Sequence, residues 1–252
     1  MRGLLAQGVK PNRLLAADAD SRTRRRVEAS LNVRTAAGNA DIARAADILI
    51  LAVKPQQLAE VLEDIRPVIT PRQVVISIAA GIPLAWLRQR LGRVPIARVM
   101  PNLPATVGCG FSAVALGRTA AARHRALARA IFEAVGEVVE LPERLFDAIT
   151  AVSGSGPAYL FFFVEAWERA ARTLGLPPSV AAAAVRATLA GSLRLLQMSE
   201  APPAILIRRV ASKKGTTEAA LHVLAQRRVA QHVAEALRAA ARRSQELTCQ
   251  CS

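Results

Sequence analysis

An uninterrupted aliphatic run, Asp47-Ile48-Leu49-Ile50-Leu51-Ala52-Val53, constrains the fold of this chain more than any other feature. A strand without alternating polar residues is buried on both faces, as in a parallel sheet. The run stops at Lys54-Pro55, and similar runs occupy residues 74–78 and 95–100. The segments between these runs, residues 58–65 and 83–91, read as helices. This alternation predicts an open, doubly wound α/β sheet whose ligands lie beyond the carboxyl ends of the strands.

The second half of the chain differs from the first because helical patterns dominate it. We therefore predict a dinucleotide-binding domain over residues 1–141 and an all-α domain over residues 142–252. The chain has 252 residues, 52% of them hydrophobic, which is enough for two modest domains. Near the start, the run Leu14–Ala17 ends at Asp18, and Ser21 opens a helical stretch to about Leu31, giving a strand, a turn and a helix.

The formal net charge of +15 suits nucleic acid, an anionic membrane or an acidic small substrate. The arginines are scattered along helices without stacking aromatics, which argues against a nucleic-acid partner. No apolar run approaches the roughly 20 residues of a bilayer span, so we expect no membrane partner. The start Met1-Arg2-Gly3-Leu4-Leu5 is too short for a signal peptide's apolar region, so we expect a cytoplasmic protein. The cysteines Cys109, Cys249 and Cys251 are too few for a disulfide framework or a zinc site, so we expect no metal.

The sequence lacks a phosphate-binding turn where a dinucleotide domain should begin. Such a domain starts with a strand and a G-x-G-x-x-G turn that places the pyrophosphate on a helix N-terminus. Residues 1–8 read instead as the tail of a first helix that runs into the Leu14 strand. We therefore expect an N-terminally truncated sheet, with roughly 15 to 20 residues of strand, turn and helix missing ahead of Met1.

A polar turn, Ser212-Lys213-Lys214-Gly215-Thr216-Thr217, opens an apolar helix late in the chain. The first backbone N–H groups of a helix lack intrahelical partners, and the helix dipole favours an anion there. The turn could therefore hold a substrate carboxylate beside a hydroxyl. The alternative is an ordinary helix cap, in which Ser212 or Thr216 bonds only to its own backbone.

Five segments, in this order, resemble the pyrroline-5-carboxylate reductases, which reduce a cyclic imine to proline with NAD(P)H. They are Leu51-Ala52-Val53-Lys54-Pro55-Gln56, Ser77-Ile78-Ala79-Ala80-Gly81-Ile82, Arg98-Val99-Met100-Pro101-Asn102, Val152-Ser153-Gly154-Ser155-Gly156-Pro157-Ala158-Tyr159 and residues 212–221. The resemblance covers nearly the whole chain. It implies a Rossmann-like N-terminal domain and a C-terminal helical domain that forms intertwined homodimers, often assembled into larger rings.

The resemblance also assigns site residues. Cofactor contacts fall on Asn39, on Ala52-Val53-Lys54-Pro55 and on Ala79-Ala80-Gly81; small residues at strand ends let a cofactor approach the backbone. The substrate falls on Ser212, Gly215 and Thr216, with backbone amides holding the carboxylate. Thr217 is the catalytic position, because the family's threonine there bonds the substrate nitrogen. The hydroxyls of Ser153 and Ser155 are expected to cap the helix that follows them.

The cofactor choice depends on the turn after the Leu14 strand. An acidic residue such as Asp18 can bind ribose hydroxyls, whereas arginine can bind a 2′-phosphate. The helix start carries Ser21 and the arginines Arg22, Arg24, Arg25 and Arg26, where amides and guanidiniums could clamp phosphate. The family commonly uses NADP, so we expect NADP, with NAD possible.

The substrate turn departs from the family at Lys213 and Lys214, where family members usually carry Ser-Pro-Gly-Gly or a close variant. If the backbone at residue 214 has a positive φ, lysine there costs on the order of 1 kcal/mol. Three hypotheses follow for the chain: a pyrroline-5-carboxylate reductase, another imine or short-chain acid reductase with the same plan, or a noncatalytic truncated relative that serves as an oligomerisation module.

Overall fold

The computed structural model describes residues 1–250, so Cys251 lies outside the described part of the chain. The chain forms two compact units, one of residues 1–155 together with the C-terminal segment from Ala240, the other of residues 156–239. This division differs from the expected boundary at residue 142. Residues 142–155 pack on the first unit, where Phe146 is buried against Ala113 and Ala115.

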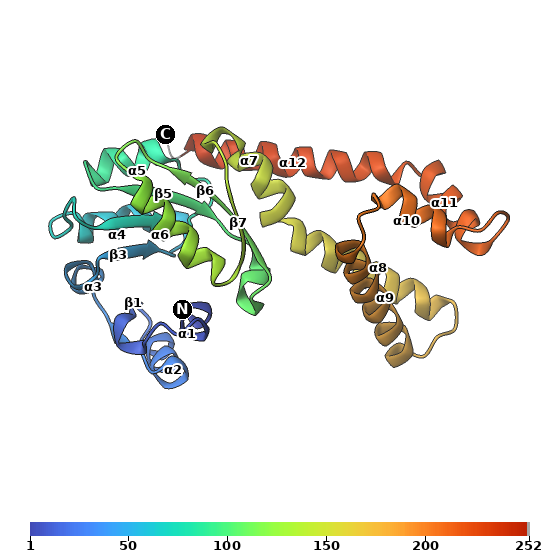
Figure 1. The fold of residues 1–252 in the computed structure, drawn as a ribbon, viewed down its shortest axis with the longest axis horizontal. Coiled ribbons are helices and arrows are strands. Elements are labelled where there is room, and N and C mark those ends of the chain that lie inside the picture. Colours follow the sequence, from blue (N-terminus) through green and yellow to red (C-terminus); the bar gives the residue numbers. More distant parts are fainter. Residues whose placement is uncertain (251–252) are drawn as a thin grey trace. The chain divides into compact units, whose positions relative to one another are not determined.

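A five-stranded sheet forms the centre of the first unit (Figure 1). Its strands follow chain order: β3 (Ile48–Leu51), β4 (Val74–Ser77), β5 (Ile96–Met100), β6 (Gly110–Leu116) and β7 (Gly136–Glu140). All neighbours pair in parallel except β5 and β6, which are antiparallel. The three aliphatic runs are therefore confirmed as parallel strands, but the sheet continues for two strands beyond Met100.

The strands β1 (Leu15–Ala17) and β2 (Arg34–Ala36) pair in parallel as a separate two-stranded sheet. Within residues 1–250 neither strand pairs with β3, so the single doubly wound sheet of the sequence analysis is two sheets here. The expectation of an N-terminally truncated sheet stays a prediction.

Helices cover both faces of the five-stranded sheet. The helices of the first unit are α1 (Arg2–Ala6), α2 (Ser21–Leu31), α3 (Asn39–Ala45), α4 (Leu58–Ile65), α5 (Leu84–Leu91), α6 (Ala122–Glu133) and α7 (Phe146–Ile149). Along β4, Val75 packs against α4 and α5, whereas Val74 and Ile76 pack toward α6. Side chains of successive strand residues point to opposite faces, so a strand covered on both sides is apolar at every position.

A partly buried ion pair joins β5 to the segment after β7. The Arg98 side chain is 6% exposed, and its Nη1 donates to Glu143 Oε1 at 2.9 Å. The same carboxylate oxygen accepts from the backbone N–H of Leu84, the first residue of α5, at 2.7 Å. The Arg98 guanidinium also lies 4.7 Å from the centre of the Phe146 ring. One carboxylate therefore pairs a buried cation and satisfies a helix start.

We expect Glu143→Ala to destabilise the first unit by on the order of 3 kcal/mol, because it leaves the Arg98 guanidinium buried and unpaired. Urea unfolding followed by circular dichroism measures the loss. The matched control is Glu137→Ala, which removes an exposed carboxylate from β7. Equal stability of the two variants would contradict this account of the ion pair.

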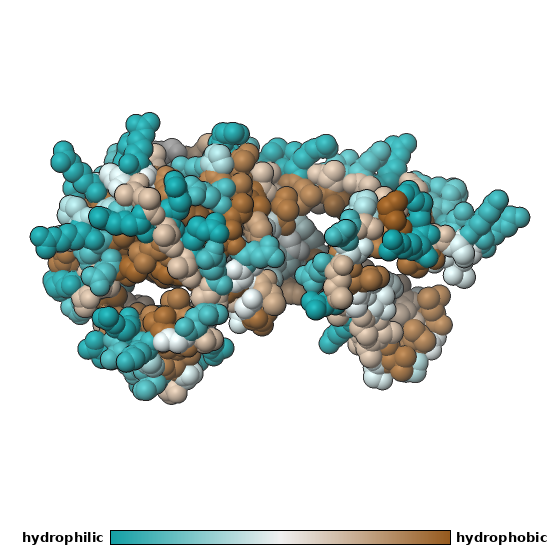
Figure 2. All heavy atoms as spheres, in the orientation of Figure 1, coloured by the Kyte–Doolittle hydropathy of each residue, from teal (hydrophilic) through white to brown (hydrophobic). Residues whose placement is uncertain are grey.

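The second unit consists of helices: α8 (Gly156–Thr173), α9 (Pro178–Met198), α10 (Pro203–Val210), α11 (Thr216–Gln226) and the first part of α12 (Val229–Gln250). Many large apolar side chains lie at its surface (Figure 2). On α8 Phe161 is 57% and Phe162 62% exposed, and on α9 Leu193 is 49% and Leu195 57% exposed. Leu193 and Leu195 lie about 200° apart around the helix, so more than one side of α9 is uncovered.

By length and composition alone, the 21-residue helix α9 could span a membrane. The expectation that no apolar segment approaches this length is therefore wrong. Alanine-rich turns keep the helix apolar although it contains Arg186 and Arg194. A helix of this length and composition is also found where it packs in the core of an assembly.

Candidate active site

Three loops leave the same edge of the five-stranded sheet. In the parallel register Leu51 lies opposite Ser77, and Ser77 lies opposite Arg98, so β3, β4 and β5 end side by side. The loops that follow contain Ala52-Val53-Lys54-Pro55, Ala79-Ala80-Gly81 and Pro101-Asn102. The structure thus brings seven of the predicted cofactor residues to the carboxyl edge, where ligands of open α/β sheets bind.

These seven residues differ in accessibility. Ala52, Lys54 and Ala80 are exposed, whereas Val53 packs against the core and Ala79 is only 5% exposed. Gly81 is buried and has φ +74°, a backbone conformation that glycine adopts without strain. The exposed positions carry methyl groups and one lysine, so the edge suits a flat ligand close to the backbone and an anionic group near Lys54.

Asn39 follows a strand of the other, two-stranded sheet. It is the first residue of α3, after the two-stranded sheet, and its Nδ2 donates to Asp64 Oδ2 on α4 at 3.1 Å. Asp18 directly follows β1, and Asn39 begins the helix that follows β2, so both residues come after carboxyl ends of the small sheet. Asn39 is therefore at a strand edge of the expected kind, but its amide is already bonded to a carboxylate.

The turn between β1 and α2 is already capped by an anion. The Asp20 carboxylate accepts from the backbone N–H groups of Arg22 at 3.0 Å and Thr23 at 3.1 Å. The Arg22 N–H, with help from Thr23, holds the pKa of Asp20 below its usual value, so Asp20 is charged at neutral pH. Arg24 donates to the backbone oxygens of Asp18 and Ala19. Asp20 thus occupies the amides of Arg22 and Thr23 in the structure, and the expectation that this helix start clamps a phosphate stays a prediction.

Two of the motifs contact each other. Asn102, after β5, donates through Nδ2 to Ser153 Oγ at 3.1 Å and accepts from the N–H of Phe111 at 2.9 Å. A Cβ on Gly154 would lie 2.6 Å from Met100 Cε, so the backbone at Gly154 packs tightly against the end of β5. Ser153 lies within a π-helical turn, Thr150–Gly154, and bonds Asn102 across the fold. Its predicted role as a simple cap of α8 is not observed.

The turn before α11 leaves the start of the helix without a side-chain cap. Gly215 is the N-cap residue, and its N–H donates to the backbone oxygen of Ser212 at 3.0 Å. The first helical hydrogen bond runs from Ala219 to Gly215, so the N–H groups of Thr216, Thr217 and Glu218 precede the ladder. The cap alternative, in which Ser212 or Thr216 caps this helix, is therefore wrong. A Cβ at Gly215 would collide with Ser212 Oγ, so a larger residue there would displace the Ser212 side chain.

The groups at this helix start differ in whether they already have hydrogen-bond partners. Thr217 is half-buried, and within residues 1–250 its hydroxyl makes no side-chain hydrogen bond. The Glu218 carboxylate accepts from the N–H of Lys214 at 2.5 Å, which closes the turn. Because the Gly215 amide is engaged within the turn, the amides of Thr216 and Thr217 are the better donors to an anion. The expected contact of the Gly215 amide with the substrate carboxylate stays a prediction.

A cavity of about 740 Å³ lies away from all these residues, between α5, the end of β6 and the segment after β7. It is lined by Leu84, Arg88, Arg118, Glu140 and Glu143 among others and contains none of the predicted site residues. Within residues 1–250, no group of three or more histidine, cysteine, aspartate or glutamate side chains is placed to hold a metal ion.

Known proteins match both parts of the chain. Residues 143–247 match the family profile for pyrroline-5-carboxylate reductase dimerisation, and residues 1–81 match that for NADP oxidoreductase, coenzyme F420-dependent. The pyrroline-5-carboxylate reductase of Synechocystis sp. is 39% identical over 94% of this chain and 88% of its own length. That of Pseudomonas aeruginosa is 38% identical over 97% and 90%. The chain belongs to the pyrroline-5-carboxylate reductase family.

Solved structures of the family share the fold. A pyrroline-5-carboxylate reductase from Coxiella burnetii superposes with a TM-score of 0.90 at 34% identity, covering 98% of this chain and 93% of that one. A pyrroline carboxylate reductase from Plasmodium falciparum, solved with NADP bound, has a TM-score of 0.89 at 27% identity, covering 98% and 92%. The predicted resemblance, the Rossmann-like fold with a helical dimerisation domain, and the assignment to the oxidoreductases are confirmed.

Compared with the usual Ser-Pro-Gly-Gly turn of this reductase family, Lys214 is a strained substitution. Its φ is +58°, in the left-handed region that lysine adopts only at a cost. We expect Lys214→Gly to stabilise the second unit by about 0.5–1 kcal/mol, the relief of that strain less the entropy of glycine. Thermal unfolding measures the change.

Lys213→Gly is the matched control, because Lys213 carries the same charge but has no positive φ. This variant should destabilise the turn. If both glycine variants shift the unfolding temperature equally, the backbone of Lys214 is not strained.

Proposed function

We propose that this chain reduces 1-pyrroline-5-carboxylate to L-proline with a hydride from NAD(P)H, the last step of proline biosynthesis. Its membership of the reductase family, over nearly its whole length, carries the proposal. The site geometry supports it, since small loop residues gather at one sheet edge and an uncapped helix start lies beside Thr217. The proposal includes homo-oligomeric assembly; cytoplasmic location and the lack of a nucleic-acid or membrane partner stay predictions.

On the cofactor side, the proposed contacts are Asn39, Ala52-Val53-Lys54-Pro55 and Ala79-Ala80-Gly81. The exposed alanines, Ala52 and Ala80, allow close approach, and Lys54 offers a cation for a phosphate or the nicotinamide amide. A reduced nicotinamide supplies the hydride when it is bound. The protein then has to orient the imine carbon toward that hydride and assist protonation of the imine nitrogen.

On the substrate side, the helix start of α11 binds the carboxylate and Thr217 contacts the imine nitrogen. The amides of Thr216 and Thr217 donate to the carboxylate, while Ser212 and Gly215 shape the turn that presents them. The Thr217 hydroxyl, with its high pKa in free solution, orients the substrate and relays a proton rather than acting as a strong acid. Lys213 and Lys214 add positive charge beside the carboxylate.

We expect Thr217→Ala to lower kcat/KM for the imine by about 10- to 100-fold, because one hydrogen bond to the reacting nitrogen is lost. Steady-state kinetics with NADPH measures it, and size-exclusion chromatography checks that assembly is unchanged. Thr173→Ala, on an exposed part of α8, is the control. Kinetics unchanged from those of the control would reject this role for Thr217. Absence of any imine reduction by the unaltered chain would instead favour a noncatalytic oligomerisation module.

For the cofactor, we propose NADP rather than NAD. The relative from Plasmodium falciparum was solved with NADP bound, and the first two turns of α2 carry the exposed residues Arg22, Arg25 and Arg26. The guanidiniums rather than the helix amides would bind the 2′-phosphate, since Asp20 occupies the amides. The Asp20 charge opposes a phosphate in the same turn.

Asp20→Ser should lower the KM for NADPH several-fold and change the KM for NADH little. Serine keeps the N-cap but removes a negative charge near the 2′-phosphate. Asp41→Ser, which removes an exposed carboxylate from the first turn of α3, serves as the control. If the two cofactors respond alike, the 2′-phosphate does not bind at this turn.

For the assembly, we propose that a second copy of the chain covers the second unit. The dimerisation profile spans residues 143–247, which includes all of α8, α9 and α11. A helix that is apolar on several sides, as α9 is, needs cover on those sides. An intertwined homodimer supplies such cover, whereas a single docked helix would leave one side bare.

The double variant Phe162→Glu with Leu195→Glu should shift the protein from dimer to monomer, because two charges would be buried in the interface. Light scattering after size-exclusion chromatography reads the mass. The control Arg169→Glu with Arg172→Glu changes two exposed residues of α8, the helix that also carries Phe162, and should leave the dimer intact. A monomeric unaltered chain, or its partition into detergent, would contradict the proposed dimer.

A further inference from the structure

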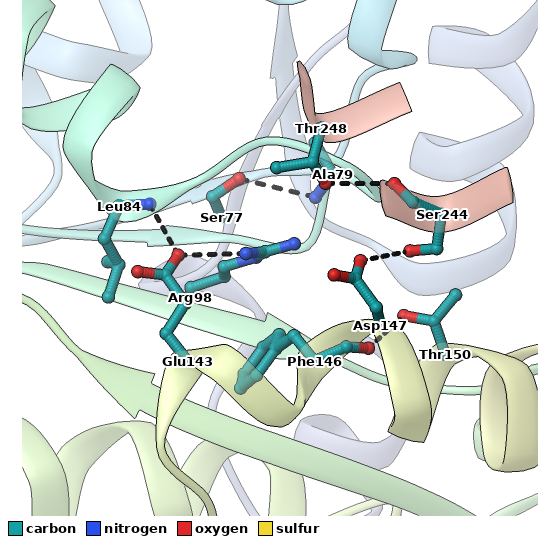
Figure 3. A network of polar contacts seen from close by, with 10 residues as sticks. All are labelled: Ser77, Ala79, Leu84, Arg98, Glu143, Phe146, Asp147, Thr150, Ser244 and Thr248. Atoms are coloured by element: carbon teal, nitrogen blue, oxygen red, sulfur yellow. Dashed lines mark hydrogen bonds and ion pairs between the residues drawn. The ribbon is translucent and has the colours of Figure 1, made fainter. Parts of the chain in front are cut away.

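The last turns of α12 belong to the first unit, although the rest of this helix belongs to the second. Their anchor is Ser244, which is 6% exposed. Its hydroxyl donates to Asp147 Oδ1 on α7 at 2.6 Å, a contact between residues 97 positions apart. Figure 3 shows the two side chains pointing toward one another, with Thr248 donating to the backbone oxygen of Ser244 one turn later.

The same turns of α12 pack on the loop after β4. A Cβ built on Gly81 would lie 3.3 Å from Leu247 Cβ, 3.6 Å from the Leu247 carbonyl carbon and 3.7 Å from the Thr248 nitrogen. The helix therefore lies directly on the loop backbone. Two residues earlier, Ala79 is 5% exposed, and its N–H donates to Ser77 Oγ at 3.3 Å. The loop is held by its own strand on one side and by α12 on the other.

Asp147 provides a firm base for this contact. Its neighbour Phe146 is 1% exposed and lies against the Arg98 guanidinium. Thr150 donates through its hydroxyl to the backbone oxygen of Phe146 at 2.6 Å, which fixes the end of α7. Because α7 is fixed to the sheet, the Ser244 hydrogen bond sets where the last turns of α12 lie. The last turns of α12 then set the position of Gly81, on which they pack.

We infer that the C-terminal turns of α12, residues 240–250, clamp the Ala79–Gly81 loop in its cofactor-binding position, with Ser244 as a positioning residue. The inference rests on the proposed function, in which this loop contacts NAD(P)H. Neither Ser244 nor Leu247 belongs to the proposed substrate turn. Loosening the clamp should therefore weaken cofactor binding and leave the KM for the imine and kcat nearly unchanged.

The test compares Ser244→Ala with Ser244→Thr, which keeps the hydroxyl, in the full chain. Arg243→Ala is the control, because Arg243 lies in the same turn but forms only an exposed ion pair with Glu246. We expect Ser244→Ala to raise the NADPH Kd, read by nucleotide fluorescence, by about tenfold, as for one lost hydrogen bond to a charged group. Ser244→Thr should restore most of the affinity.

A second measurement needs no cofactor. Hydrogen exchange of the amides of residues 79–82 in the unliganded protein should be faster in Ser244→Ala than in Arg243→Ala, because the loop loses its cover. Unchanged exchange, or an unchanged NADPH Kd alongside faster exchange, would overturn the inference. Failure of the unaltered chain to bind NADPH would count against the proposed function, and exchange alone would then decide whether the clamp exists. If Ser244→Ala does not fold, Asp147→Ala, which removes the acceptor of the same hydrogen bond, replaces it in both measurements.

Discussion

The buried guanidinium of Arg98 is the constraint around which the first unit is arranged. A cation at 6% exposure on a central strand requires a carboxylate, and Glu143 supplies one from the segment after β7. Glu143 can do so only if β6 and β7 complete the sheet beside β5. The same carboxylate holds the start of α5, and Phe146 covers the guanidinium. The Arg98–Glu143 ion pair thereby joins β5, the start of α5 and the segment after β7, which are far apart in the sequence.

Helix α7 connects the Arg98 ion pair to the loops of the candidate site. The helix begins at Phe146 beside Arg98 and presents Asp147 to Ser244, whose helix lies on the loop after β4. Further along, the π-helical turn brings Ser153 to Asn102 at the end of β5. Two of the three loops at the carboxyl edge are therefore supported from the C-terminal half of the chain. Such supporting contacts matter because binding geometry depends on residues behind the site.

Local patterns predicted the elements whose signals lie within a few residues. The helices α2 and α4 begin and end where the sequence placed them, and β3, β4 and β5 lie within the aliphatic runs. The strands β6 and β7 were not predicted, because Gly110–Leu116 is broken up by small residues and one serine, and Gly136–Glu140 contains two glutamates. Their burial depends on β5 and on α6, which no local pattern encodes. The strain at Lys214 was predicted from the sequence, because the family usually has glycine at this position.

By itself, the sequence determined the family, the α/β-then-helical plan and which residues are candidates for the site, because hydrophobic periodicity and short motifs are local properties. Only the tertiary structure decided which candidates are accessible: Ala52 and Ala80 are exposed, Ala79 and Gly81 are buried, and the amides at α2 are occupied by Asp20. It also revealed the contacts of Arg98 with Glu143 and of Ser244 with Asp147. Hydrogen bonds between residues 45 and 97 positions apart depend on the packing of whole elements, and no local pattern records that packing.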